Sequence, residues 1–515
     1  MRRAIVGSIF VLSLLPSAYL AWQGRDLPHL GSFHDDAIYL GTARTLALGG
    51  PYRIDSLPWT PAQTKYPPLY PLYLSIAWRM ADSPDQALPL AMLLNWLWLP
   101  VFVVGVYRLL LVNGQPQPVA LSIAALSALH PEMQMASTRL MSDLMFAALA
   151  IWSLALATSS SAALAALAYL TRSAGLPLFA GLAGTRLLAR QWRQAGVLLT
   201  TAALTIGAWT LWVSANKSSA LTAVEKYYTD YFAYQWQVVP LASLPAHLYQ
   251  QLDPLVAAVS RTLLLNFGDA LGWVLLSRIA FVASVAGIVR LMRRGQLTAY
   301  GTYALFSTLM MLVWYFPPDT RALLPLLPLI AVGFYTESSN FTQVLTKAWS
   351  KGGAGRVVAV ILALLFASLP LGMLANARAS LTMNGAPMFA SERRFQPGLM
   401  AAYRWIEANT PAETSFFTVD DPVFHLYTHR RALRLPELAL VFERGPGGDY
   451  RPSATTLAAM DQFHLACLFV AAKHFNPDPN EPNAPLRFSV AGTGLAERYR
   501  TPMELVACRP VKEQP

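Results

Sequence analysis

QALPLAMLLNWLWLPVFVVGVYRLLLV, residues 86–112, is a long apolar run whose only charged residue is Arg108. About 20 consecutive apolar residues are enough for a helix to cross the hydrocarbon core of a bilayer. Further apolar runs of spanning or near-spanning length occupy residues 4–22, 118–130, 144–158, 162–171, 175–188, 195–214, 271–289, 298–316, 321–336 and 357–376. We therefore predict an α-helical polytopic membrane protein with about eleven transmembrane helices.

The composition agrees with this class. Of the 515 residues, 55% are hydrophobic and only 13% are charged, whereas a soluble domain carries about 25% charged residues. The net charge of +11 could indicate a nucleic-acid partner. The basic residues, however, cluster in short loops between apolar runs, at 186–194, 290–297 and 345–356. This is the positive-inside pattern of membrane proteins, and it argues against nucleic-acid binding.

The basic loops also predict a topology. If the amino terminus is cytoplasmic, all three loops fall on the cytoplasmic side of the membrane. Residues 23–85, 215–270 and those after 376 then face the outside. Residues 1–22 resemble a secretory signal, but no small-residue cleavage site follows them, so we interpret them as an uncleaved first span.

We expect a transmembrane module over residues 1–376 and a small extracytoplasmic α/β domain over 377–515. In the second domain the patterns predict helices at 398–409 and 455–463, and strands at 415–419, 465–471 and 504–508. Cys467 and Cys508 fall in two of these strands. They either pair in an oxidising compartment or remain two buried thiols.

Asp35 and Asp36 lie in the run GSFHDDAIY, residues 31–39, shortly after the first apolar segment. Acidic residues beside a membrane core are costly unless they are solvated, paired or used in chemistry. They could simply cap the start of a helix. Alternatively, one carboxylate deprotonates an acceptor hydroxyl as a general base. Neighbouring side chains in a helix point about 100° apart, so we expect only one of them to face a site.

Basic and acidic residues of the outer loops could complete such a site. Lys65, in Lys65-Tyr66-Pro67-Pro68, either snorkels to the headgroups or clamps a lipid phosphate. Asp143 is either a helix cap or a second acidic residue of the site. Arg172 and Arg321 break the positive-inside bias and need partners. Arg321 could pair with Asp319 or reach a lipid phosphate.

Two further features bear on the function. Residues 227–236 are dense in aromatic side chains, which form either an interfacial belt or the lining of a sugar or lipid groove. The eight histidines show no metal-ligand spacing, and we expect His34 to be a solvated loop residue. The absence of a Walker loop, G-x-S-x-G and H-E-x-x-H argues against ATP-driven transport and soluble-type hydrolase chemistry.

At these residues the chain resembles the GT-C superfamily of membrane glycosyltransferases, in its protein O-mannosyltransferase-like and lipid A aminoarabinose transferase-like branch. The resemblance rests on four stretches that together with the span array cover most of the chain: His34 to Tyr39 with Ala43 to Gly50 and Tyr52; Lys65 to Leu69; Pro131 to Asp143; and Arg321 to Pro328.

The resemblance implies transfer of a sugar from a polyprenyl-phosphate-linked donor, with inversion at the anomeric carbon. It identifies Asp35, with Asp36 beside it, as the catalytic pair, and Lys65 as the ligand of the lipid phosphate, with Arg321 and Arg172 as further ligands. Asp143, Tyr66 and Tyr39 correspond to substrate-binding positions. This chain has Asp36 where Glu is frequent, and Thr64 where a relative can place a metal-binding acid. A divalent metal therefore stays open, and no cofactor is assigned.

We expect a multi-pass protein of the bacterial inner membrane, active on the periplasmic side, whose acceptor is a lipid, a glycan or a protein. Two other classes stay open. One is a transporter or flippase for a lipid-linked sugar, which inverted repeats and charges inside the spans would support. The other is a non-catalytic envelope-assembly protein, for which Asp35→Asn would leave function intact.

Overall fold

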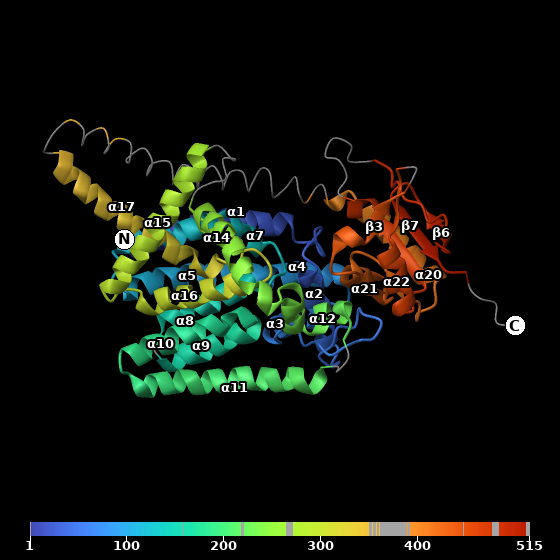
Figure 1. Cartoon of the computed structure of the whole chain (residues 1–515), viewed down its shortest axis with the longest axis horizontal. Helices are drawn as coiled ribbons and strands as arrows, with labels where there is room; N and C mark the ends of the chain where they lie inside the picture. Colours follow the sequence, from blue (N-terminus) through green and yellow to red (C-terminus); the bar gives the residue numbers. More distant parts are fainter. Residues whose placement is uncertain are drawn as a thin grey trace.

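The computed structural model of the chain describes residues 2–156, 158–217, 221–263, 271–349, 392–445, 448–475 and 484–510, with the single positions 353, 357, 360 and 389. Figure 1 shows a helical bundle with a smaller mixed domain, coloured orange to red, at one end of it. The predicted fold class, a helical membrane bundle followed by a small α/β domain, is confirmed. The predicted boundary between residues 376 and 377 lies outside the described residues.

Among the residues that the structure describes, four helical segments are long and apolar enough to cross a membrane. They are Ala4–Gln23 of α1 (Arg2–Gln23), the continuous segment of α4 (Pro84–Trp96) and α5 (Trp98–Val112), α11 (Trp192–Asn216), and Val274–Arg293 of α15 (Leu271–Arg293). The other bundle helices are α6 (Gln117–Leu129), α8 (Asp143–Ala155), α9 (Thr158–Thr171), α10 (Leu176–Leu188), α14 (Leu244–Arg261), α16 (Thr298–Val313) and α17 (Leu327–Trp349). The total of eleven spans stays a prediction, because 357–376 lies almost wholly outside the described residues.

One predicted span differs in its bounds from the structure. The apolar run 321–336 predicts a span with approximate bounds, and in the structure α17 begins only at Leu327 and continues to Trp349. Pro325 lies in a short 3-10 turn, η3 (Leu324–Leu326), ahead of the helix. Proline has no backbone N–H and restricts the residue before it, so the helix starts after it. Arg321 consequently lies in a loop, where its side chain can reach other elements.

Small residues let the bundle helices pack closely. A Cβ on Gly287 of α15 would lie 1.8 Å from the carbonyl oxygen of Gly333 in α17, and a Cβ on Gly181 of α10 would lie 2.6 Å from the backbone of Tyr303 in α16. Only glycine permits such approaches, which are typical of helix pairs in membranes. The result is a tightly packed frame for the connecting segments.

Short helices make up the connecting segments: α2 (Asp35–Ala47), α3 (Leu69–Arg79), α7 (Pro131–Ser137), α12 (Ala223–Thr229) and α13 (Tyr231–Val238). In Figure 1, α2, α3 and α12 lie at the bundle end beside the C-terminal domain. The turn between α10 and α11, which carries the first basic loop, lies at the opposite end. The chain therefore separates its basic turn from the end that carries α2.

The C-terminal domain contains a five-stranded mixed sheet in the order β2-β1-β5-β7-β6. Its strands are β1 (Phe416–Phe417), β2 (Ala432–Leu433), β5 (Cys467–Ala471), β6 (Ala496–Arg500) and β7 (Glu504–Cys508), and its helices are α20 (Gln396–Asn409), α21 (Asp421–Thr428) and α22 (Ala454–Gln462). A separate hairpin joins β3 (Phe442–Arg444) to β4 (Tyr450–Pro452). Each of the predicted helices and strands is present, within about three residues of its predicted ends.

A disulfide links two strands within this domain, and contacts with the loops of the bundle hold the domain in place. Cys467 and Cys508 lie opposite each other on β5 and β7 and form a disulfide, so the alternative of two buried thiols is wrong. The domain also contacts the loops of the bundle end: the amide of Ala432 donates to the carbonyl of Ser56 at 2.8 Å, and Trp59 stacks on Phe463. The sheet is thus attached to the segment that contains α2.

Candidate active site

Asp35 is the first residue of α2 and follows a tight turn. Gly31 and His34 both have positive φ angles, 93° and 61°. Glycine adopts such angles without steric cost, whereas a histidine must be held there by its surroundings. A side chain on Gly31 would also collide with Val423 of α21, because a Cβ would lie 2.7 Å from it. The turn is therefore shaped by the C-terminal domain packed against it.

The Asp35 carboxylate faces the loop before α3. The Tyr66 hydroxyl donates a short hydrogen bond to Asp35 Oδ1, and Lys65 Nζ lies 3.9 Å from the same oxygen. The Asp35 side chain remains 26% exposed, whereas that of Lys65 is only 2% exposed. Three residues expected at one site thus meet, and the acid among them is open to solvent.

Aromatic rings surround the Lys65 ammonium group. Its nitrogen lies 4.1 Å from the ring centroid of Tyr227, 4.3 Å from that of Tyr231 and 5.0 Å from that of Tyr66. Burial lowers the pKa of Lys65 to about 8, and the charge of Asp35 opposes this shift. Ring faces stabilise a cation without accepting conventional hydrogen bonds, so the ammonium can still donate to an anionic ligand.

Asp36 has a different environment. It is buried, and its carboxylate accepts from the amide of Ala37 at 2.7 Å and from that of Gly31 at 3.2 Å. Burial raises the pKa of Asp36 to about 7. The two adjacent carboxylates thus make separate contacts, as the helical geometry predicted. Asp36 holds the turn that precedes α2, and Asp35 faces Lys65.

Asp143 binds two of the predicted cations. It is the first residue of α8, and its Oδ1 lies 3.0 Å from Arg172 Nη1 and 3.2 Å from Arg321 Nε. The alternative partner for the Arg321 side chain, Asp319, instead accepts from the amide of Ala322. The structure therefore brings Arg172 and Arg321 together around Asp143, and not around Lys65.

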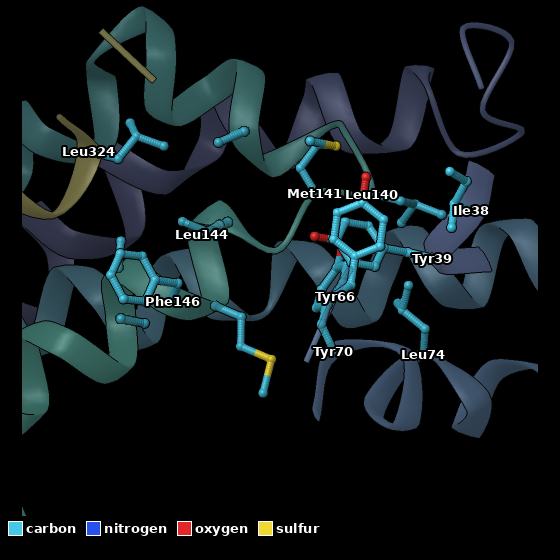
Figure 2. Packing of buried hydrophobic residues seen from close by; sticks show 14 of the residues in the cluster. Ile38, Tyr39, Tyr66, Tyr70, Leu74, Leu140, Met141, Leu144, Phe146 and Leu324 are labelled. Carbon is cyan, nitrogen blue, oxygen red and sulfur yellow. The ribbon is translucent and has the colours of Figure 1, made fainter. Parts of the chain in front are cut away.

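Tyr39 and Tyr66 lie between Asp35 and Asp143. Their ring centroids lie 4.7 Å apart, and Figure 2 shows them gathered with Tyr70 above Leu74. The Tyr39 hydroxyl contacts Ser142 Oγ at 3.1 Å, next to Asp143, while Tyr66 donates to Asp35. Tyr39 is buried, so its ring separates the pair of Asp35 and Lys65 from Asp143 and its two arginines.

The sequence did not reveal that the C-terminal domain contributes to this site. His34 Nε2 lies 2.8 Å from Asp421 Oδ1, and the Tyr228 hydroxyl donates to Asp421 Oδ2 at 3.1 Å. His34 and Asp421 are both buried, so the expectation of a solvated His34 is wrong. Nothing local in the sequence indicates a contact across 387 positions. The aromatic run at 227–236 was the available signal, because two of its tyrosines cover Lys65.

The side chains around Asp35 do not form a metal site. The described residues contain no group of three or more His, Cys, Asp or Glu side chains with metal-site geometry. The nearest partners of Asp35 are an ammonium and a phenol, neither of which suits a hard divalent cation. Thr64 donates to the carbonyl of Thr229 at 2.6 Å. This donor set fits an anionic ligand beside Lys65 better than a metal.

The fold of this chain, an apolar helical bundle followed by a small mixed domain, is similar to the folds of two kinds of solved transferase, ArnT and an archaeal oligosaccharyltransferase. ArnT from Cupriavidus metallidurans, solved with undecaprenyl phosphate, matches with a TM-score of 0.52 and 13% identity over 98% of each chain. The Archaeoglobus fulgidus oligosaccharyltransferase AglB, in complex with an inhibitory peptide and a dolichol-phosphate, matches with a TM-score of 0.53 and 13% identity over 100% of this chain and 75% of AglB.

A second structure of the Archaeoglobus fulgidus oligosaccharyltransferase, tethered to an acceptor peptide, matches with a TM-score of 0.52 and 12% identity over 91% of this chain and 69% of that protein. No protein-family model matches the sequence, and no curated protein matches it. At these identities the similarity establishes the fold, while the function has to be argued from the residues of the site.

Proposed function

We propose that this chain is a membrane glycosyltransferase that moves a sugar from a polyprenyl-phosphate-linked donor to an acceptor hydroxyl, with inversion at the anomeric carbon. The observation that carries the proposal is the pairing of a partly exposed Asp35 with a caged, nearly buried Lys65 at the end of an apolar bundle. The dolichol-phosphate bound to AglB and the undecaprenyl phosphate bound to ArnT support this type of donor.

The Asp35 carboxylate acts as the general base. It accepts the proton of the acceptor hydroxyl while the hydroxyl oxygen bonds to the anomeric carbon of the sugar. Attack from the face opposite the phosphate inverts the configuration. The hydrogen bond from Tyr66 orients the carboxylate, and its exposure leaves room for the acceptor to approach.

Lys65 binds the leaving group. The bond between the anomeric carbon and the phosphate oxygen breaks, and its electron pair stays on that oxygen. The departing polyprenyl phosphate gains negative charge, and a buried ammonium stabilises it more strongly than an exposed one, because the surroundings are less polar than water. Arg172 and Arg321 are occupied by Asp143, so we assign them to the support of the outer loops.

The proposed orientation follows from the same features. The basic turn between α10 and α11 lies at the end of the bundle away from α2 and the C-terminal domain (Figure 1). With that turn in the cytoplasm, the Asp35 site faces the periplasm of the inner membrane, which is where a disulfide such as Cys467–Cys508 is stable.

The test supplies polyprenyl-phospho-sugars to membranes that carry the wild type or single variants. Asp35→Asn should abolish sugar transfer, and Asp82→Asn, which changes an exposed acid of an outer loop, should leave it unchanged. Transfer at the full rate in Asp35→Asn would exclude the mechanism. Transfer that persists in Asp35→Asn but disappears in Asp36→Asn would assign the base to Asp36.

A further inference from the structure

The proposed reaction needs more positive charge at the phosphate than Lys65 supplies. A donor phosphodiester carries one negative charge, and the polyprenyl phosphate that leaves carries up to two. Buried anions are stable only when cations or hydrogen-bond donors compensate for them. A second cation near Lys65 is therefore expected. Arg172 and Arg321 are each paired with Asp143, which compensates part of their charge, so a cation without such a carboxylate fits this part better.

Arg434 lies on the C-terminal domain side of Lys65. It directly follows β2, and its backbone carbonyl accepts from the Tyr228 hydroxyl at 3.4 Å. Tyr228 is the neighbour of Tyr227, whose ring lies 4.1 Å from Lys65 Nζ. The charge of Arg434 lowers the pKa of Lys65, in addition to the larger effect of burial. The two cations thus lie close enough to act on one another.

Among the residues that the structure describes, no carboxylate forms an ion pair with the Arg434 side chain. Its Nε atom is buried and has no hydrogen-bond partner there. The nearby acid, Asp421, already has one oxygen on His34 and the other on Tyr228.

A buried guanidinium donor without an acceptor is costly. The charges of Asp421 and Asp420 act on Arg434 from farther away, and its side chain contacts the Tyr227 hydroxyl beside Lys65. The free Nε can therefore donate to an anion placed between Arg434 and Lys65.

We infer that Arg434, supplied by the C-terminal domain, binds the phosphate of the polyprenyl donor together with Lys65. The inference rests on the proposed function and extends it, since it makes the phosphate site a joint product of the bundle loops and the C-terminal domain. The ligand class is a polyprenyl phosphate monoester or its glycosyl diester. Lys65 and Arg434 are both needed for full affinity for this phosphate.

The test measures binding of undecaprenyl phosphate to the purified full-length protein in detergent. Arg434→Gln should weaken binding by at least about tenfold, the loss expected for one charge-assisted hydrogen bond. Arg431→Gln is the matched control, because Arg431 is exposed and directly precedes β2, the strand that Arg434 follows. Arg434→Lys keeps the charge and should retain more affinity than Arg434→Gln. Binding of undecaprenol, which has no phosphate, should be equal in all four proteins.

A measurement on the wild type keeps the test independent of the folding of variants. Phenylglyoxal labels arginines, and undecaprenyl phosphate should protect Arg434 from it, whereas undecaprenol should not. Equal labelling with and without the lipid phosphate, or unchanged affinity in Arg434→Gln, would overturn the inference.

Two outcomes distinguish this inference from the proposed function. If Lys65→Gln loses affinity and Arg434→Gln does not, the role of Arg434 fails and the glycosyltransferase proposal stands. If the wild type binds undecaprenyl phosphate no more tightly than undecaprenol, both fail. Inorganic phosphate that binds as tightly as the lipid would indicate a site for free phosphate, and would also contradict the inference.

Discussion

Asp35 and Asp143 occupy comparable places in the chain but have opposite surroundings. Each is the first residue of a helix, α2 or α8. The Asp143 side chain is only 5% exposed and contacts two arginines at 3.0 and 3.2 Å. The Asp35 side chain is 26% exposed and has one lysine at 3.9 Å. The same residue type binds two arginines through one oxygen in one place and is open to solvent in the other.

The difference shows how one loop region can combine rigidity with reactivity. A carboxylate between two guanidinium groups stabilises the structure, because its removal leaves both cations without a partner. A carboxylate held by one tyrosine and a distant ammonium can exchange partners and accept a proton. We therefore interpret Asp143 as a structural anchor and Asp35 as the reactive group. The following substitutions test this division.

Replacement of Asp35 should have the largest effect. Asp35→Asn removes the base without changing the size of the side chain, so sugar transfer should fall by about 10²- to 10⁴-fold. Thermal stability should change little, because Asp35 lies in no tight ion pair. The measurements are the initial rate of transfer and the unfolding midpoint in detergent. A large loss of stability with little loss of rate would reverse the roles of Asp35 and Asp143.

Replacement of Asp143 should instead act on stability. Asp143→Asn leaves Arg172 and Arg321 without a carboxylate, and since both are partly exposed we expect a loss of roughly 2 kcal/mol, below the range for fully buried pairs. The unfolding midpoint in detergent should fall for this variant. Arg321→Gln is the control, because it removes one of the two pairs and should have a smaller effect. An unchanged midpoint would show that the Asp143 cluster is not an anchor.

The comparison also shows what sequence reasoning can and cannot reach. The helices of the bundle were predictable because twenty or so apolar residues in a row are a local signal. The proximity of Asp35 to Lys65 followed from one loop. The pairing of Arg321 with Asp143 could not be predicted, because the two residues are 178 positions apart. The sequence around an arginine does not indicate which distant carboxylate it will bind. The contact between His34 and Asp421 was equally hidden.

The pH dependence of donor use should distinguish the Lys65 centre from the Asp143 cluster. Lys65 has a pKa lowered to about 8 by burial, so it loses its charge as the pH rises through 8, and kcat/KM for the donor should fall about tenfold per pH unit above that value. The groups that face it are Asp35, Tyr66, Tyr227 and Tyr231, with Arg434 and Asp421 nearby.

Lys65→Arg provides the control for this profile. The guanidinium stays charged, so kcat/KM should remain flat between pH 8 and about pH 10 if the variant is active. A wild-type profile that stays level above pH 9 would show that the charge of Lys65 is not needed for the donor. A fall in both proteins would assign the titration to another group.

Replacement of Tyr66 should have the smallest effect. Tyr66→Phe keeps the ring against Lys65 and Tyr39 but removes the hydroxyl that donates to Asp35. Loss of one hydrogen bond to a charged group costs about 1.5–3 kcal/mol when the acceptor is buried. Because Asp35 is partly exposed, water can replace the donor, so kcat should fall only a few fold while the KM of the donor stays constant. Tyr39→Phe, whose hydroxyl contacts Ser142 instead, should leave kcat closer to the wild type. A loss as large as that of Asp35→Asn would mean that the phenol takes part in the proton transfer and does not merely orient the carboxylate.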